Sequence, residues 1–112
     1  MSDIIRIGNC SGFYGDRLKA AIEMVEGGPI DVLTGDYLAE LTMKILYDQR
    51  EQRGAHLGYV GTFLKQFEEV VAACLARGIK IVTNAGGLNP AGLTEEVEKV
   101  LKAQGLQAKV AY

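Results

Sequence analysis

The main candidates for a catalytic pair in this chain are two carboxylates four residues apart, Asp36 and Glu40. They stand where a helix is predicted to begin, and residues i and i+4 of a helix lie on the same face. Two carboxylates in a dry cleft have pKa values that are pushed apart, which would let one act as a general acid or base. They could instead bind a metal ion, or Asp36 could only cap the helix. We predict catalytic roles for Asp36 and Glu40, and no metal site.

Two glycine-rich turns each follow a short apolar run. The first turn, Gly8–Asp16, comes after Ile4–Ile7, and the second, Asn84–Pro90, comes after Lys80–Thr83. A strand that runs into a glycine turn and then a helix places backbone N–H groups at its carboxyl end. We therefore expect both turns to line one shared crevice.

Residues in and beside these turns could bind a carbonyl or an anionic group. Their spacing matches neither the dinucleotide-binding motif nor the P-loop. The glycines could instead be required where φ is positive or where two backbone segments pack closely, and Asn89 could be a helix cap. The predicted substrate-binding residues are Ser11, Gly12, Asp16, Arg17, Asn84, Gly86, Gly87 and Asn89.

Other reactive side chains have simpler explanations. Cys10 follows the first apolar run, near a helix start where the pKa of a thiol can fall, but a buried inert thiol is the alternative. Cys74 lies on an apolar stripe and is predicted to be core. The single histidine, His56, is predicted to be a surface residue in a loop. Phe13 and Tyr14 could wall an apolar pocket or pack over the sheet end.

The composition excludes several classes of protein. A formal charge of −2 argues against a nucleic-acid surface, and the apolar runs are far too short to span a membrane. Two cysteines do not make a disulfide framework. The first residues lack the features of a signal peptide, so we predict a cytoplasmic location.

Periodicity and turn residues predict four strands and four helices. Asp16 is the expected N-cap of the first helix, and Gly27–Pro29 the expected stop. The strands are predicted at 4–7, 30–34, 79–83 and 108–111, and the helices at 17–26, 38–52, 60–77 and 90–104.

This βαβααβαβ order predicts one α/β domain over residues 1–112. We expect a parallel four-stranded sheet with helices on both faces and the flavodoxin-like or Rossmann-like strand order 2-1-3-4. In that order the chain reverses direction between the first and third strands. Ligands of open α/β sheets bind at such a reversal, and both glycine turns follow the strands that flank it.

Three blocks of sequence resemble the acyclic terpene utilisation (AtuA) family. They are Arg6–Arg17, Thr34–Met43 and Thr83–Pro90, which occur in the same order and at similar spacing. Because family members are usually several times longer, the resemblance implies that this chain is the N-terminal segment of a longer protein. It departs from many relatives at Cys10, where they carry a small residue without a thiol. The signature residues carried over are Ser11, Gly12, Gly15, Asp16, Arg17, Gly35, Asp36, Glu40, Asn84, Gly86, Gly87, Asn89 and Pro90.

The resemblance implies a role in bacterial breakdown of acyclic terpenoids such as citronellol and geraniol, through CoA thioesters and a biotin-dependent carboxylation. The substrate would be a small molecule or a CoA thioester, and the sequence does not identify a cofactor. Two alternatives stay open. One is a non-catalytic assembly module, for a carboxylase subunit or a homo-oligomer. The other is a flavodoxin-like domain that binds a phosphate or nucleotide.

Overall fold

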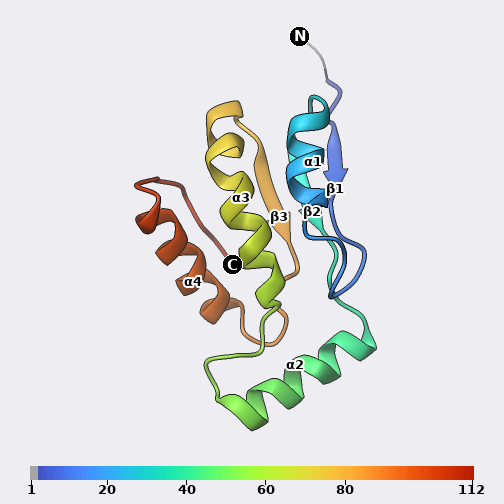
Figure 1. Ribbon diagram of the computed structural model, residues 1–112, viewed down its shortest axis with the longest axis vertical. Helices are drawn as coiled ribbons and strands as arrows, with labels where there is room; N and C mark the ends of the chain where they lie inside the picture. Colours follow the sequence, from blue (N-terminus) through green and yellow to red (C-terminus); the bar gives the residue numbers. More distant parts are fainter. Residues whose placement is uncertain (1–2) are drawn as a thin grey trace.

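The computed structural model describes residues 3–112 as a three-stranded parallel sheet with four helices (Figure 1). This confirms the α/β class. The order of elements is that predicted from the sequence as far as the fourth helix. The elements are β1 (Ile7–Asn9), α1 (Ala20–Gly27), β2 (Val32–Gly35), α2 (Glu40–Arg53), α3 (Gly61–Arg77), β3 (Lys80–Thr83) and α4 (Pro90–Ala103).

The strand order is β1-β2-β3, so the predicted order 2-1-3-4 is wrong for the strands present. Strand β2 lies in the centre and pairs with both neighbours, and β1 does not touch β3. Each crossover therefore moves the chain one place in the same direction. No residue in the sequence encodes that direction, which is why the analogy with flavodoxin-like sheets misplaced β1.

The helices cover one face of this sheet, not both as predicted. The pairing register aligns Gly8, Leu33 and Ile81 in one row, and these residues pack against the helices. The alternate residues point the other way, and Ile7 and Val82 are 65% and 58% exposed there. Right-handed crossovers that all advance in one direction leave helices α1, α3 and α4 on the same side, which explains the bare face.

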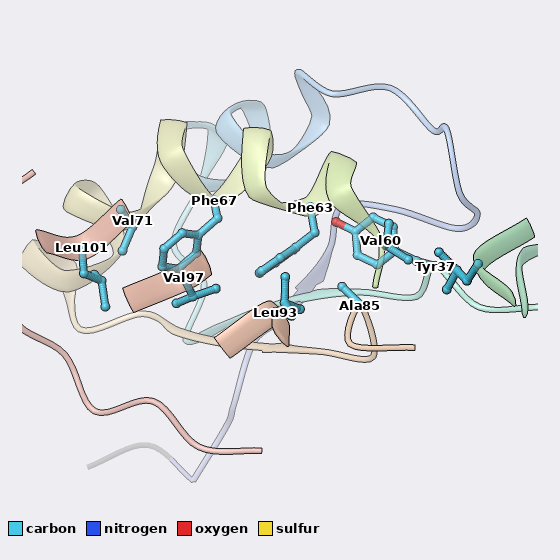
Figure 2. Close-up of a cluster of buried hydrophobic side chains, with 10 residues drawn as sticks. Tyr37, Val60, Phe63, Phe67, Val71, Ala85, Leu93, Val97 and Leu101 are labelled. Atoms are coloured by element: carbon cyan, nitrogen blue, oxygen red, sulfur yellow. The ribbon is translucent and has the colours of Figure 1, made fainter. Parts of the chain in front are cut away.

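The core lies between the sheet and helices α1, α3 and α4. Helix α3 is central, with α1 on one side of it and α4 on the other (Figure 1). Its predicted apolar stripe is confirmed by its buried residues, and Phe63 and Phe67 point from it toward Leu93 and Val97 of α4 (Figure 2). Gly78 ends the helix in a left-handed conformation, with φ of 69°.

Several element boundaries differ from prediction. Strand β1 begins at Ile7 instead of Ile4. Helix α1 begins only at Ala20, so Asp16 is not its N-cap, and Leu18 precedes the helix. The predicted helix start at residue 38 is also early, since α2 begins at Glu40, and Leu41 in its first turn is 72% exposed. Local patterns identify these elements but do not define their ends.

The predicted fourth strand, Ala108–Ala111, is not a strand in this structure. The segment follows α4 without regular structure, yet Leu106 and Val110 are partly buried against the core. Within residues 3–112, no helix is both long and apolar enough to cross a bilayer.

Candidate functional site

The first glycine turn is joined directly to the end of β2. The backbone N–H of Cys10 donates to the carbonyl of Thr34 at 2.8 Å, and that of Asp36 donates to the carbonyl of Ser11 at 2.9 Å. Parallel strands end at the same edge of a sheet, so continuing the ladder by two bonds brings the turn beside residues 34–37. The first and second sequence blocks therefore meet at the carboxyl edge.

Asn84 joins the second glycine turn to the same place. Its Oδ1 accepts the backbone N–H of Tyr37 at 2.9 Å, and its Nδ2 donates to Oδ1 of Asp36 at 2.7 Å. The N–H of Tyr37 can only donate, so it fixes the orientation of the amide and directs Nδ2 at the carboxylate. Thr83 adds a bond from Oγ1 to the carbonyl of Gly35 at 3.0 Å. All three blocks thus converge on residues 35–37.

Asp36 is exposed at this edge and is held by Asn84, not by Glu40. Its Oδ1 also lies 3.4 Å from the N–H of Leu38, a weaker contact. Glu40 is the exposed first residue of α2, and its carboxylate makes no hydrogen bond or ion pair with any residue in the range 3–112. The catalytic pair therefore stays a prediction, while the positioning of Asp36 by Asn84 is a feature of the structure.

Asp16 organises the interior of the first turn. Its carboxylate accepts hydrogen bonds from the backbone N–H groups of Gly12 and of its neighbour Arg17, each at 2.8 Å. These two bonds lower the pKa of Asp16. The N–H of Gly12 is thus already occupied within the turn. Arg17 extends to Glu23 at 2.5 and 2.7 Å, and this bond raises the pKa of its guanidinium.

The second turn packs against backbone. Gly87 has φ of +55°, and a Cβ there would lie 2.9 Å from the carbonyl oxygen of Gly58 and 2.5 Å from Leu46 of α2. A Cβ on Gly86 would lie 2.9 Å from Pro90. Two structural roles were left open for these glycines, a positive φ angle and close packing. Gly87 has both, and Gly86 has the close packing.

Asn89 is the N-cap of α4, which was the simpler of its two predicted roles. Its Oδ1 accepts the N–H of Gly92 at 3.0 Å. Its Nδ2 donates to the carbonyls of His56 and Leu57 at 3.1 and 3.2 Å. The side chain thus connects the start of α4 to the loop before α3.

A buried polar cluster lies beneath the exposed edge. The hydroxyl of Tyr37 donates to Oε1 of Gln66, both side chains being nearly inaccessible. Burial raises the pKa of Tyr37, and the thiol of Cys10 and the hydroxyl of Ser11 are close enough to influence it. Ser11 also donates from Oγ to the carbonyl of Phe13 at 3.1 Å. The sequence signal for this cluster was Gln66, a polar residue inside the apolar stripe of α3.

The thiols do not show the features of nucleophiles. Burial raises the pKa of Cys10, which is the opposite of what a reactive thiolate needs. Cys74 is buried on α3, as predicted.

Three candidate residues remain, namely His56, Tyr14 and Phe13. His56 is exposed in the loop after α2, as predicted. Tyr14 accepts a bond from Nε2 of Gln49 at 3.3 Å, which ties α2 to the first turn, while Phe13 is exposed. In Figure 1, α2 lies across the carboxyl ends of the strands. It therefore forms one side of the candidate site.

A family model covers almost the entire chain. The model of the acyclic terpene utilisation family protein AtuA matches residues 5–112. The chain belongs to the AtuA family. In this AtuA-family chain the matched region includes all three segments that meet at Asp36. Among curated proteins and among solved structures, neither comparison gives a match. No group of three or more metal-binding side chains occurs in the described part of the chain.

Proposed function

We propose that this chain acts in the catabolism of acyclic terpenoids or acyl-CoA compounds, and that it contributes a substrate-binding or acid/base site at the carboxyl ends of the strands. The observation that supports this most is the Asn84–Asp36 contact of 2.7 Å at the exposed edge. Family membership supports the pathway, and the location supports the site, because open α/β sheets bind ligands outside the carboxyl ends of their strands.

In this proposal Asp36 is the reacting or substrate-facing carboxylate, and Asn84 fixes its direction. A carboxylate held in one orientation can act as a base once a substrate lies within hydrogen-bond reach. Glu40, from α2, is the proposed second carboxylate. Ser11, Asp16 and Arg17 would shape the adjoining wall.

The nucleotide alternative has less support from the contacts. A phosphate cradle needs backbone N–H groups that point at the ligand. The N–H groups of Gly12, Gly87 and Leu88 instead donate to Asp16, Asn84 and Gly58 within the fold.

The test is growth on citronellol of a strain that depends on this protein. Asp36→Asn keeps an oxygen for Asn84 to bond but removes the charge, so the fold should persist while growth fails. Glu40→Gln tests the second carboxylate in the same way. Glu98→Gln, which changes an exposed carboxylate of α4, is the matched control. Normal growth of the Asp36→Asn strain, with the protein present at its usual level, would remove Asp36 from the mechanism.

A second candidate function, an assembly module, is favoured by the bare face of the sheet. Parallel sheets are normally covered on both faces, yet Ile7 and Val82 are exposed on this one. We propose light scattering and a pull-down with a carboxylase subunit, comparing the unchanged protein with Ile7→Glu. Loss of an oligomer or complex in Ile7→Glu alone would favour assembly. A monomer that captures no subunit would argue against it.

A further inference from the structure

A groove of about 620 Å³ runs between β3 and the segment after α4. All four residues of β3 line it, and its floor is apolar. At one end it reaches Gly86 and Pro90 of the second turn. The apolar residues of its floor include Phe63, Phe67, Val71, Leu93, Val97 and Leu101.

Strand β3 is the last strand of the sheet in the described part of the chain, and one of its edges is open. An open edge presents unpaired N–H and C=O groups that can pair with another strand. Here that edge lies beside an apolar floor, so an incoming strand would gain both a hydrogen-bond ladder and buried side chains.

Residues 108–112 already lie beside this edge, since they line the groove together with β3. The segment turns back at the end of α4 (Figure 1), and its residues 108–112 line the groove. Val110 is partly buried against the core cluster, whereas Lys109 and Ala111 are exposed. Ala108 and Tyr112, two residues to either side of Val110, are exposed as well, so Val110 alone of residues 107–112 packs against the core.

We propose that β3 accepts residues 108–110 as a fourth parallel strand, which gives the order β1-β2-β3-β4. The crossover through α4 then repeats the direction and hand of the two before it. This proposal stands on the groove and the register of the sheet, and does not depend on the proposed catalytic or assembly role.

The register follows from the two faces of the sheet. Ile81 faces the helices, so its partner must do so as well, which leaves Ala108 or Val110. Pairing Val110 with Ile81 would set Lys109 directly opposite Lys80, and like charges opposite each other are unfavourable. The structure therefore assigns Ala108 to Ile81 and Lys109 to Val82, with Val110 opposite Thr83.

This pairing adds a residue to the candidate site. A strand advances about 3.3 Å per residue, so Tyr112 would lie about 7 Å beyond the level of Thr83, beside the second turn. Tyr112 is 83% exposed and lines the same groove as Gly86 and Pro90. Its phenol would then add an aromatic wall and a hydroxyl to the carboxyl edge.

The experiment is cysteine cross-linking within the chain. Val82→Cys with Lys109→Cys puts two thiols on the bare face, directly opposite each other. Neighbouring strands are about 4.8 Å apart, within the Cα separation that a disulfide spans. The matched pair, Lys80→Cys with Lys109→Cys, reports the alternative register. The native cysteines, Cys10 and Cys74, are buried, so they should not compete with the introduced thiols.

Peptide mapping after mild oxidation should find the 82–109 disulfide within one chain, and several-fold less of the 80–109 disulfide in the matched pair. In the unchanged protein, the amide of Lys109 should exchange more than about tenfold slower than an unstructured amide. A dominant 80–109 disulfide, cross-links only between chains, or unprotected exchange at Lys109 would overturn the proposal.

Discussion

Tyr37 links the buried and exposed parts of the candidate site. Its hydroxyl bonds Gln66 in the core, and its backbone N–H fixes the side chain of Asn84, which in turn bonds Asp36. The ring of Tyr37 also meets that of Phe63 edge-on, with centroids 6.1 Å apart. The direction of the exposed carboxylate therefore depends on a side chain that solvent does not reach.

Tyr37→Phe should destabilise the protein because it leaves the buried Oε1 of Gln66 without a donor. We expect the free energy of unfolding in urea to fall by about 1–3 kcal/mol. Tyr47→Phe, at a half-exposed tyrosine of α2, is the matched control and should change it little. Equal stability of the two variants would contradict the role assigned to the Tyr37 hydroxyl.

The lowered pKa of Asp16 leads to a prediction about how stability depends on pH. Its pKa in the folded chain lies below the ordinary 3.8, so folding favours its charged form. The stability it contributes is therefore fully present above pH of about 4, and is lost as pH falls through the lower folded pKa. The difference in unfolding free energy between the protein and Asp16→Asn should shrink over that acidic range. A difference that stays constant from neutral pH down to acid would contradict this assignment.

The sequence predicted that the glycine turns would share an edge of the sheet, but not the contacts that their residues make there. Glycine turns after apolar runs indicated where Ser11 and Asn84 would lie, because strand ends in a parallel sheet share an edge. It could not show that Asn84 bonds Asp36 while Glu40 stands apart, because those contacts depend on loop paths. Asp16 looked like a helix cap, since an aspartate before a helix and an aspartate inside a turn read alike in sequence.

The second turn depends on close packing between segments distant in sequence. Gly87 touches the carbonyl of Gly58, and the N–H of Leu88 donates to that same carbonyl at 2.8 Å. Leu46 of helix α2 lies close to the same point, 2.5 Å from the position of a Cβ on Gly87. The turn is thereby fixed against the loop that leads into α3.

Gly87→Ala should therefore be costly. A methyl group there meets backbone and Leu46, at a positive φ that alanine adopts poorly, so we expect a loss of about 1–3 kcal/mol in unfolding free energy. Gly27→Ala is the control, since a Cβ there meets nothing within 4 Å, and it should be neutral or raise stability by up to about 1 kcal/mol. Thermal and urea unfolding would measure both, and an equally stable Gly87→Ala protein would show that this packing is not tight.

Helices were easier to predict than strands. The stripe of α3 and the Asn89–Pro90 start of α4 are encoded locally, by periodicity and by capping chemistry. Strand β1 has only three residues, and its start depends on where β2 offers partners. The segment 108–111 shows the same dependence, because its sequence favours a strand but it does not pair with β3 in this structure.

The crossovers between strands all advance in one direction, and this accounts for the shape of the molecule and for its bare face. Three parallel strands that advance in one direction place all covering helices together, so the opposite face carries Ile7 and Val82 into solvent. The sequence predicted a crevice where the strand order reverses, but the order β1-β2-β3 contains no reversal. The glycine turns still share an edge, because every parallel strand ends there.

Substitutions on the two faces should therefore differ sharply. Ile7→Thr, on the bare face, should change the unfolding free energy of the isolated chain by no more than about 0.5 kcal/mol. Leu33→Ala, in the neighbouring row that faces the helices, should cost about 2–5 kcal/mol. Urea denaturation would compare them, and a large loss for Ile7→Thr would show that this face is covered in the free protein.

The convergence of the three family blocks is tested most directly by NMR of the isotopically labelled chain. A shared edge predicts nuclear Overhauser contacts between the side-chain amide protons of Asn84 and the backbone amide proton of Tyr37. It also predicts a downfield Tyr37 amide signal that shifts when Asn84 is replaced by alanine in a still-folded protein. Absence of those contacts, with a Tyr37 signal that ignores the substitution, would contradict a shared site at this edge.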